Sequence, residues 1–416
     1  MPAVGDRVER AKLRVESIRT GLTIGASVTA AFALLLAFRR QQLAERTQQA
    51  TEYDAGEKRV TELYVKAADQ LGSDKAPVRL AGLYALERLA QDNPAHRQSI
   101  VEVICAYLRM PYTPPNDQPT PEPDDQQPAD GFDPAAPTDA TGDSDKPAVD
   151  PREERQVRLA AQRILGRHLR PTTPEEQPDP LYWGTKVTLD LTEAVLVDLD
   201  FTRCHLHNAT FTKTHFTGST RFGGATFSSF AGFDRAMFSG NAWFGEAAFS
   251  GAALFSGATF SGDAWFGEAA FSGDALFGEA AFSDAALFDK ATFSRFAVFG
   301  EATFSSFVGF GKATFSGPAL FGKATFNGDA WFGEAAFSGA GFFGKATFNG
   351  DATFGKAAFS DAAWFDEATF NDAAWFDEAT FNGTARFEGA TFNGTARFEG
   401  ATLAGARYDG PEPVAE

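Results

Sequence analysis

From Phe222 to Phe398 this chain places a phenylalanine at alternating steps of five and six residues. An 11-residue unit therefore recurs sixteen times between these two positions. So regular a period is typical of a solenoid, in which each unit stacks on its neighbours and buries an apolar face that it could not bury alone. This repeat restricts the fold of the segment more than any other feature of the chain.

Before the long array the period is a plain five residues. Its apolar centres are Leu191, Leu196, Phe201, Leu206, Phe211 and Phe216. A small or modest apolar residue lies two positions before each centre, and in the long array it is nearly always alanine, as at Ala225, Ala247 and Ala258. Residues i and i−2 of an extended strand point to the same side. We therefore predict that these residues fill a square coil, with one short strand and one turn per side.

The sixth residue of the longer steps is expected in a turn. The five-residue step from Phe266 to Phe271 and the six-residue step from Phe260 to Phe266 both keep an alanine two positions before the next phenylalanine. The extra residue therefore falls among the Gly-Asp, Asp-Ala and Gly-Thr pairs that favour turns. We predict about ten coils of roughly 22 residues, with longer corners on two opposite sides and a height of about 48 Å.

Residues 186–408 resemble the pentapeptide-repeat family in these apolar centres and in the small residues two positions before them. The chain departs from the family pattern, which repeats every five residues, because every second step here is six. Segments 61–64, 78–90 and 106–112 are similar to the helical module that precedes such repeats in actinobacterial membrane-associated proteins. The resemblance implies a right-handed quadrilateral β-helix behind an α-helical N-terminal region.

An uncharged run at residues 22–38 lies between Arg19 and Arg39. It narrowly reaches the length of about 17 to 20 apolar residues that a spanning helix needs, so we expect a single-pass transmembrane helix after an N-terminal tail at 1–21. The alternatives are a secretory signal peptide, for which no convincing cleavage site follows, and a buried helix of a soluble domain.

The two cysteines, Cys105 and Cys204, lie in different predicted domains. A disulfide framework is therefore not expected, and a reducing compartment fits better. This favours a solenoid on the cytoplasmic side of the cell membrane.

Residues 39–110 are predicted to form a helical module of three helices. The first ends at Gly72, the second begins at Pro77 and has Tyr84 in its apolar stripe, and the third contains Cys105. Core packing is the expected role of this tyrosine and this cysteine.

Residues 111–150 are rich in Pro, Asp and Gln and have few aliphatic side chains, so we predict a disordered acidic linker there. A further helix is expected at 151–171, docked on the start of the β-solenoid at 186–408. A disordered tail is expected at 409–416.

Residues that directly precede the inward phenylalanines are expected to face outward. On five-residue steps they are Thr or Ala, but on six-residue steps they are large and apolar. Counting by 22 aligns the large ones in two columns on opposite sides. The leucine-rich column consists of Leu254, Leu276, Val298, Leu320, Phe342 and Trp364. The tryptophan-rich column consists of Trp243, Trp265, Leu287, Trp331 and Trp375, interrupted by Gly309 and Thr353. Contiguous exposed apolar surface marks a contact site, so we expect these columns to bind a protein partner or a second copy of the chain, unless their side chains cover one another.

The net charge of −18 argues against direct nucleic-acid binding. Some pentapeptide-repeat proteins bind DNA gyrase by imitating the charge of DNA, and the 24 acids and 14 bases of residues 186–408 make such mimicry the alternative function. Opposite signs nevertheless meet along the row two positions after the phenylalanines, which predicts cross-strand ion pairs instead of an unbroken anionic stripe. This row is Glu246, Glu268, Lys290, Lys312, Glu334, Lys356 and Glu378.

No catalytic, cofactor-binding or metal-binding residues are predicted. Cys204, His205, His207 and His215 include the ligand types of a metal site, but the five-residue register points the cysteine inward and the histidines outward on two sides. Tetrahedral ligation needs convergence. The acidic residues lie in turns of an open convex surface without a pocket. We therefore predict a non-enzymatic, membrane-anchored scaffold for protein interactions.

Overall fold

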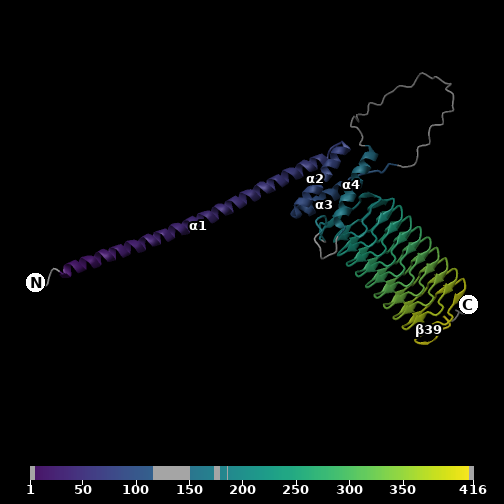
Figure 1. Cartoon of the computed structure of the whole chain (residues 1–416). Coiled ribbons are helices and arrows are strands. Elements are labelled where there is room, and N and C mark those ends of the chain that lie inside the picture. The colour runs from purple at the N-terminus through teal and green to yellow at the C-terminus, as the bar shows by residue number, and fades with distance from the viewer. Residues whose placement is uncertain (1–4, 116–149, 173–178, 185, 412–416) are drawn as a thin grey trace, which may run out of the picture. The chain divides into compact units, whose positions relative to one another are not determined.

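The structure is a computed structural model that describes residues 5–115, 150–172, 179–184 and 186–411. Side chains are described for these residues except 5–8, 18, 20–33 and 49–55. The chain divides into two compact units, residues 1–66 and 67–416, whose elements are labelled in Figure 1.

Helix α1 (Gly5–Leu71) forms the first unit, and its last residues belong to the second. It ends directly before Gly72, where the sequence predicts the end of a helix, and it is continuous through residues 22–38. No helix in the described part of the chain is long and apolar enough to cross a membrane. Residues 22–33 of the predicted span have side chains outside the described set, so the transmembrane helix stays a prediction.

The structure describes three further α-helices and one 3-10 turn in the second unit. They are α2 (Ala76–Asp92), η1 (Pro94–His96), α3 (Arg97–Arg109) and α4 (Pro151–Leu169). Proline stands in the first turn of α2, η1 and α4, where its missing N–H is no loss. The Asp150 side chain caps α4 by accepting a hydrogen bond from the Arg152 N–H at 2.8 Å. We call α2, η1, α3 and α4 the helical cap.

The helical cap has its own apolar core. Leu83, Leu86, Ile104 and Leu165 are almost completely buried where α2, α3 and α4 pack together. Tyr84, which the sequence placed in the apolar stripe of α2, is instead 50% exposed. The prediction is wrong because consecutive helix positions differ in direction by about 100°, so Tyr84 lies beside the buried face that Leu83 occupies.

The acidic segment does not separate the helical module from the rod. Helix α4 follows this segment in the chain, yet it packs on both α2 and α3, which precede it. The expected disorder at 111–150 concerns residues that for the most part, 116–149, lie outside the described residues. The helices on either side of that segment form one cap.

The repeat array folds into four parallel sheets, which we name A to D in chain order around the coil. Sheet A consists of β1 (Thr188–Asp190), β4 (Asn208–Thr210), β8 (Ala231–Gly232), β12 (Ala253–Leu254), β16 (Ala275–Leu276), β20 (Ala297–Val298), β24 (Ala319–Leu320), β28 (Gly341–Phe342), β32 (Ala363–Trp364) and β36 (Ala385–Arg386). Sheet C, on the opposite side, consists of β6 (Thr220–Arg221), β10 (Ala242–Trp243), β14 (Ala264–Trp265), β18 (Ala286–Leu287), β22 (Val308–Gly309), β26 (Ala330–Trp331), β30 (Ala352–Thr353), β34 (Ala374–Trp375) and β38 (Ala396–Arg397).

Sheets B and D alternate with sheets A and C around the coil. Sheet B runs from β2 (Val195–Val197) to β37 (Thr391–Phe392). Sheet D runs from β3 (His205–Leu206) to β39 (Thr402–Leu403), on which β40 (Ala406–Arg407) folds back antiparallel. Figure 1 shows the coils stacked from teal near the cap to yellow at β39.

The register confirms the predicted coils of 22 residues in the long array and shows a shorter first coil. In the first coil Thr188 pairs with Asn208 and Val195 with His215, so that paired residues stand twenty positions apart. Further along, Ala242 pairs with Ala264, and the separation has grown to twenty-two positions. The plain five-residue period therefore builds the shorter coil, and the alternation of five and six builds the longer ones.

Phenylalanine fills the axis of the rod, as predicted. Phe310 has no exposed surface, and its ring stacks on those of Phe288 and Phe332 at centroid distances of 4.9 Å. It meets the rings of Phe299 and Phe321 edge to face at 5.2 and 5.3 Å. Both arrangements are favourable for aromatic quadrupoles, so each ring gains contact with neighbours in two directions. The alanines two positions before the phenylalanines are also buried.

The two kinds of corner have different geometry. In the five-residue corner after Phe277, the Ala280 N–H donates to the Phe277 carbonyl at 3.1 Å, and Glu279 adopts φ 59°. In the six-residue corners the extra residue lies in the bend, as predicted. Gly240 lies in such a bend, and a Cβ there would be 2.5 Å from the Gly218 carbonyl oxygen of the previous coil. Close stacking of the longer corners explains this glycine.

Two glutamine side chains join the cap to the rod. Gln98 of α3 accepts from the Thr188 N–H at 3.0 Å and donates to the Thr188 carbonyl at 3.1 Å. Gln162 of α4 makes the same pair of bonds with Val197, at 3.0 and 2.7 Å. Each amide thus replaces the neighbouring strand that the first coil lacks on this side, which leaves these backbone groups satisfied.

Candidate interaction surface

The two predicted columns lie on opposite faces of the rod. The leucine-rich column runs along sheet A and the tryptophan-rich column along sheet C, each one residue before an inward phenylalanine. Trp243, Trp331 and Trp364 are 37%, 52% and 36% exposed, and the other members are half-buried. The outward positions of sheets B and D carry mainly Thr and Ala, with Val195, His205, His215 and Met237 in the first coils. Large apolar surface is therefore concentrated on two of the four faces.

Neighbours within each column cover one another in part. The rings of Trp243 and Trp265 stack at 4.9 Å, and those of Phe342 and Trp364 meet edge to face at 4.7 Å. The columns are thus partly self-covered and partly exposed. Each side chain rests on the next one and still presents an apolar edge to solvent.

Arginines close both columns at the end far from the cap. The Arg386 guanidinium lies 5.7 Å from the centre of the Trp364 ring, and that of Arg397 lies 5.0 Å from the Trp375 ring. Such cation–π contacts add modest stability at exposed sites. These arginines were not predicted from the sequence, although each stands one coil after the tryptophan that it covers. Phe296, which precedes Val298 in a long corner and is 48% exposed, was not predicted either.

Charged residues form two rows, which lie in the short, five-residue corners. We call Glu246, Glu268, Lys290, Lys312, Glu334, Lys356 and Glu378, between sheets C and D, the tryptophan-side ladder, and Glu279, Glu301, Lys323, Lys345 and Glu367, between sheets A and B, the leucine-side ladder. Lys290 pairs with Glu268 at 2.8 Å and Lys323 with Glu301 at 2.9 Å. The hydrogen bond from each lysine to its glutamate raises the pKa of these two ammonium groups. Positive and negative groups thus meet along both ladders, as predicted for the first.

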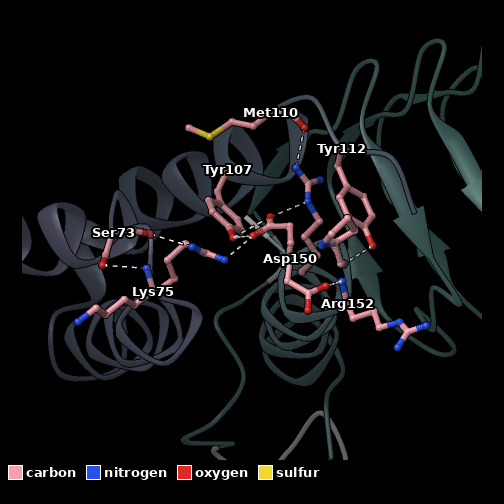
Figure 2. A network of polar contacts seen from close by, with 11 residues as sticks. Ser73, Lys75, Tyr107, Met110, Tyr112, Asp150 and Arg152 are labelled. Carbon is pink, nitrogen blue, oxygen red and sulfur yellow. Dashed lines mark hydrogen bonds and ion pairs between the residues drawn. The ribbon is translucent and has the colours of Figure 1, made fainter. Parts of the chain in front are cut away.

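A buried ionic network holds the cap together where the acidic segment leaves and returns (Figure 2). The Glu154 carboxylate accepts hydrogen bonds from Tyr107 and Arg158 at 2.9 Å and lies 3.1 Å from Arg79. Arg158 donates to the Met110 carbonyl at 2.6 Å. Burial, reinforced by the charge of Glu154, raises the pKa of Tyr107. Each buried charge has an ionic partner, so the network fixes three helices without an orphaned ion.

Ring contacts also tie the two ends of the acidic segment to each other. The Arg158 guanidinium lies 4.5 Å from the centre of the Tyr112 ring, before the segment. The Tyr112 hydroxyl donates to the Pro151 carbonyl, after the segment, at 3.4 Å. These contacts give a structural role to residues that the sequence analysis did not select.

The cysteine and histidines of the first coils are held apart by different partners. The Cys204 thiol is buried and donates to the Gly166 carbonyl at 3.5 Å, while His205 contacts Tyr182 at 3.2 Å and His207 contacts Ser228 at 3.1 Å. Among the residues that the structure describes, no group of three ligand side chains could hold a metal ion. Burial raises the pKa of the Cys204 thiol, and that of Cys105, to about 12.

Four parallel sheets around a phenylalanine axis define the repeat array as a four-sided β-solenoid. The family profile described as pentapeptide repeats (9 copies) matches residues 201–247, 233–281, 310–358, 321–369 and 365–407. The repeat array of this chain belongs to the pentapeptide-repeat family. No curated protein and no solved structure is significantly similar to it.

Proposed function

We propose that this chain is a non-enzymatic scaffold that binds protein through the outer faces of its solenoid. The observation that carries the proposal is the concentration of large apolar side chains on sheets A and C, next to Thr- and Ala-lined sheets B and D. A rod needs no large side chains outside its axis to be stable, because the inward phenylalanines already provide the core. Exposed aromatic rows are typical of protein contact sites, where Trp is enriched.

The proposal includes attachment to the cell membrane. The uncharged run at 22–38 would form the single span, and the free thiols favour a cytoplasmic rod of right-handed coils. Attachment would hold the rod near the bilayer and raise the local concentration of partners there. The similarity of segments 61–64, 78–90 and 106–112 to an actinobacterial membrane-associated module supports this part of the proposal.

DNA mimicry remains the alternative from the sequence, but no observation favours it. An imitation of DNA needs rows of anionic groups, and the lysines of both ladders interrupt such rows. Gyrase supercoiling in the presence of the protein would test this alternative directly.

The experiment replaces exposed tryptophans of sheet C in the full-length protein. A triple variant, Trp243→Ser, Trp265→Ser and Trp331→Ser, should lose most of its partner in an affinity capture from the native membrane fraction. The matched control changes outward threonines of sheet D, Thr292→Ser and Thr314→Ser, and should retain the partner. Unchanged capture by a folded triple variant would contradict the proposal.

A further inference from the structure

The leucine-side ladder has a symmetric order of charges. Glu279, Glu301, Lys323 and Lys345 lie on four successive coils at the corner between sheets A and B, and all four are exposed. Two negative groups are followed by two positive groups. The same row read from the other end, with every sign reversed, is unchanged. It can therefore pair with a second, antiparallel copy of itself.

The leucine-rich column has its midpoint at the same height. Its six members occupy six coils from Leu254 to Trp364, so its centre falls between Val298 and Leu320. Glu301 follows Val298 by three residues, and Lys323 follows Leu320 by three. The centre of the charge pattern and the centre of the apolar column thus lie between the same two coils. These are two independent features of the chain with a common centre.

From this coincidence we infer that sheet A is the interface of an antiparallel homodimer. This rests on the proposed function, since it names the occupant of one of the two proposed faces. The two-fold axis runs along the strand direction between the coils of Val298 and Leu320. It sets Glu279 against the partner's Lys345, Glu301 against the partner's Lys323, Leu276 against the partner's Phe342, and Val298 against the partner's Leu320.

Symmetry explains why the arrangement is antiparallel. A two-fold interface brings the same patch of both subunits together, so each patch must complement itself. The axis along the strands keeps the two ladders on the same edge of the interface. An axis along the rod would place each ladder against the opposite edge of sheet A. Beyond the four central charges, Glu367 faces the partner's Gly257 and Arg235 faces the partner's Gly389, so no like charges meet within the ladder.

The intrachain ion pairs leave the ladder available for this role. Lys323 and Glu301 are 63% and 56% exposed, and pairs of that kind contribute little to the stability of the chain itself. Complementary rim charges act mainly on the choice and orientation of a partner. The apolar column would supply the burial, and the ladder would fix the direction.

On the opposite face, sheet C, the centre of the apolar column and the centre of the charge pattern do not coincide. On sheet C the row from Trp243 to Trp375 is centred on the coil of Gly309, whereas the signs of the tryptophan-side ladder reverse between Glu268 and Lys290. An axis at that reversal would also set Arg203 against the partner's Lys356. Sheet C is therefore left for a different protein.

The first test changes the charges of the leucine-side ladder in the full-length protein, solubilised in mild detergent. The acidic variant is Lys323→Glu with Lys345→Glu, and the basic variant is Glu279→Lys with Glu301→Lys. Sedimentation velocity should show a dimer for the parent and a dissociation constant at least about tenfold higher for each variant alone, because like charges then face each other. An equimolar mixture of the two variants should regain the parent affinity as a heterodimer.

The matched control applies the same chemistry to the other ladder. Lys290→Glu with Lys312→Glu removes two lysines from the corner between sheets C and D, and should leave the dissociation constant unchanged. Circular dichroism and thermal unfolding would confirm that all variants fold. A monomeric parent, an unaffected acidic variant, a mixture without recovery, or an equal loss in the control would each overturn the inference.

The second test measures the register. Chains with Leu276→Cys are mixed with chains with Phe342→Cys under mild oxidation. In the proposed dimer these positions face each other, whereas two copies of Leu276→Cys are three coils apart, or about 14 Å, beyond the reach of a disulfide. Mixed disulfides should form and like disulfides should not. The opposite outcome would exclude the antiparallel register.

The results separate this inference from the proposed function. If the protein forms a dimer with this register and the triple tryptophan variant still captures its partner, the homodimer is supported and the proposed partner site on sheet C is contradicted. If the protein is monomeric and the triple variant loses its partner, the scaffold function is supported and the homodimer is contradicted.

Discussion

Stability at the scale of single residues depends on the aromatic rings in the axis. The inward phenylalanines up to Phe381 are wholly or almost wholly buried, Phe392 near the far end is half-buried, and the rings touch others of their own sheet and of neighbouring sheets. Burial of such a side chain contributes about 1.5–3 kcal/mol. Because the coils between Phe222 and Phe381 repeat this contact, the rod is stabilised along most of its length.

Phe310→Ala should destabilise the rod by about 3–5 kcal/mol, because it removes a wholly buried ring and leaves a cavity between two stacked neighbours. Chemical denaturation followed by far-UV circular dichroism measures the loss. The control, Thr314→Ala, changes a half-buried outward side chain four residues away and should cost less than about 1 kcal/mol. A Phe310→Ala variant that unfolds at the same denaturant concentration as the parent would refute the inward placement.

Thiol chemistry provides a second prediction for single residues. Burial raises the pKa of Cys105 and Cys204 to about 12, so at pH 8 alkylation of the native protein should be far slower than that of the unfolded chain. A cysteine thiol of the unfolded chain has a pKa of about 8.5. The contribution of the two buried neutral thiols to the free energy of unfolding is therefore fully present below that pH. It is lost as the pH rises toward 12, because the unfolded thiols ionise first. Mass spectrometry of iodoacetamide adducts at pH 8, with and without urea, measures the difference, and equal rates would contradict this account.

At the scale of elements, the short corners place non-glycine residues in the left-handed region of backbone conformation, which could not be predicted from the sequence. Glu334 adopts φ 59°, and its counterparts along both ladders adopt φ between 54° and 60°. Glu334→Val should cost about 1–3 kcal/mol, because a β-branched residue is strained in the left-handed region. Glu334→Gly should be tolerated within about 1 kcal/mol, since glycine adopts this φ freely. Thermal unfolding of both variants compares them, and equal stability would contradict the turn geometry.

The junction of cap and rod is the other element with a testable role. Gln162→Leu would leave the Val197 N–H and carbonyl without their two hydrogen bonds, so we expect a loss of about 2–4 kcal/mol. Native-state hydrogen exchange should show faster exchange at the Val197 amide. The matched control, Arg163→Ala, changes an exposed neighbour on α4 and should leave that amide protected. Unchanged protection in Gln162→Leu would mean that the amide does not cap the strand.

Sequence periodicity was sufficient to predict the rod but not the cap. Phenylalanine spacing gave the coil length, the inward rings and the columns, because every inward position recurs once in each coil. The packing of α4 on α2 and α3 could not be predicted, since it depends on single side chains such as Glu154 and Arg158 that carry no period. Tyr84 was misplaced for a similar reason, because a short amphipathic stripe does not fix the edge of the buried face.

At the scale of the whole molecule, the four faces of the rod have separate properties. Sheets B and D expose mainly Thr and Ala, sheet C exposes a tryptophan-rich column, and sheet A pairs its apolar column with a self-complementary ladder. We therefore expect the rod to bind a second copy of the chain on one side and a different protein on the opposite side. The helical cap covers the first coil and leaves these faces open further along the rod.

Site-directed photo-crosslinking in cells tests this division of the surface most directly. A photoreactive amino acid is placed in turn at Leu276 on sheet A, Thr303 on sheet B, Trp331 on sheet C and Thr314 on sheet D of the full-length protein. We expect covalent dimers of this chain from Leu276, an adduct with a different protein from Trp331, and only background from the two threonine positions. Equal yields from all four faces, or no adduct from Leu276 and Trp331, would contradict it.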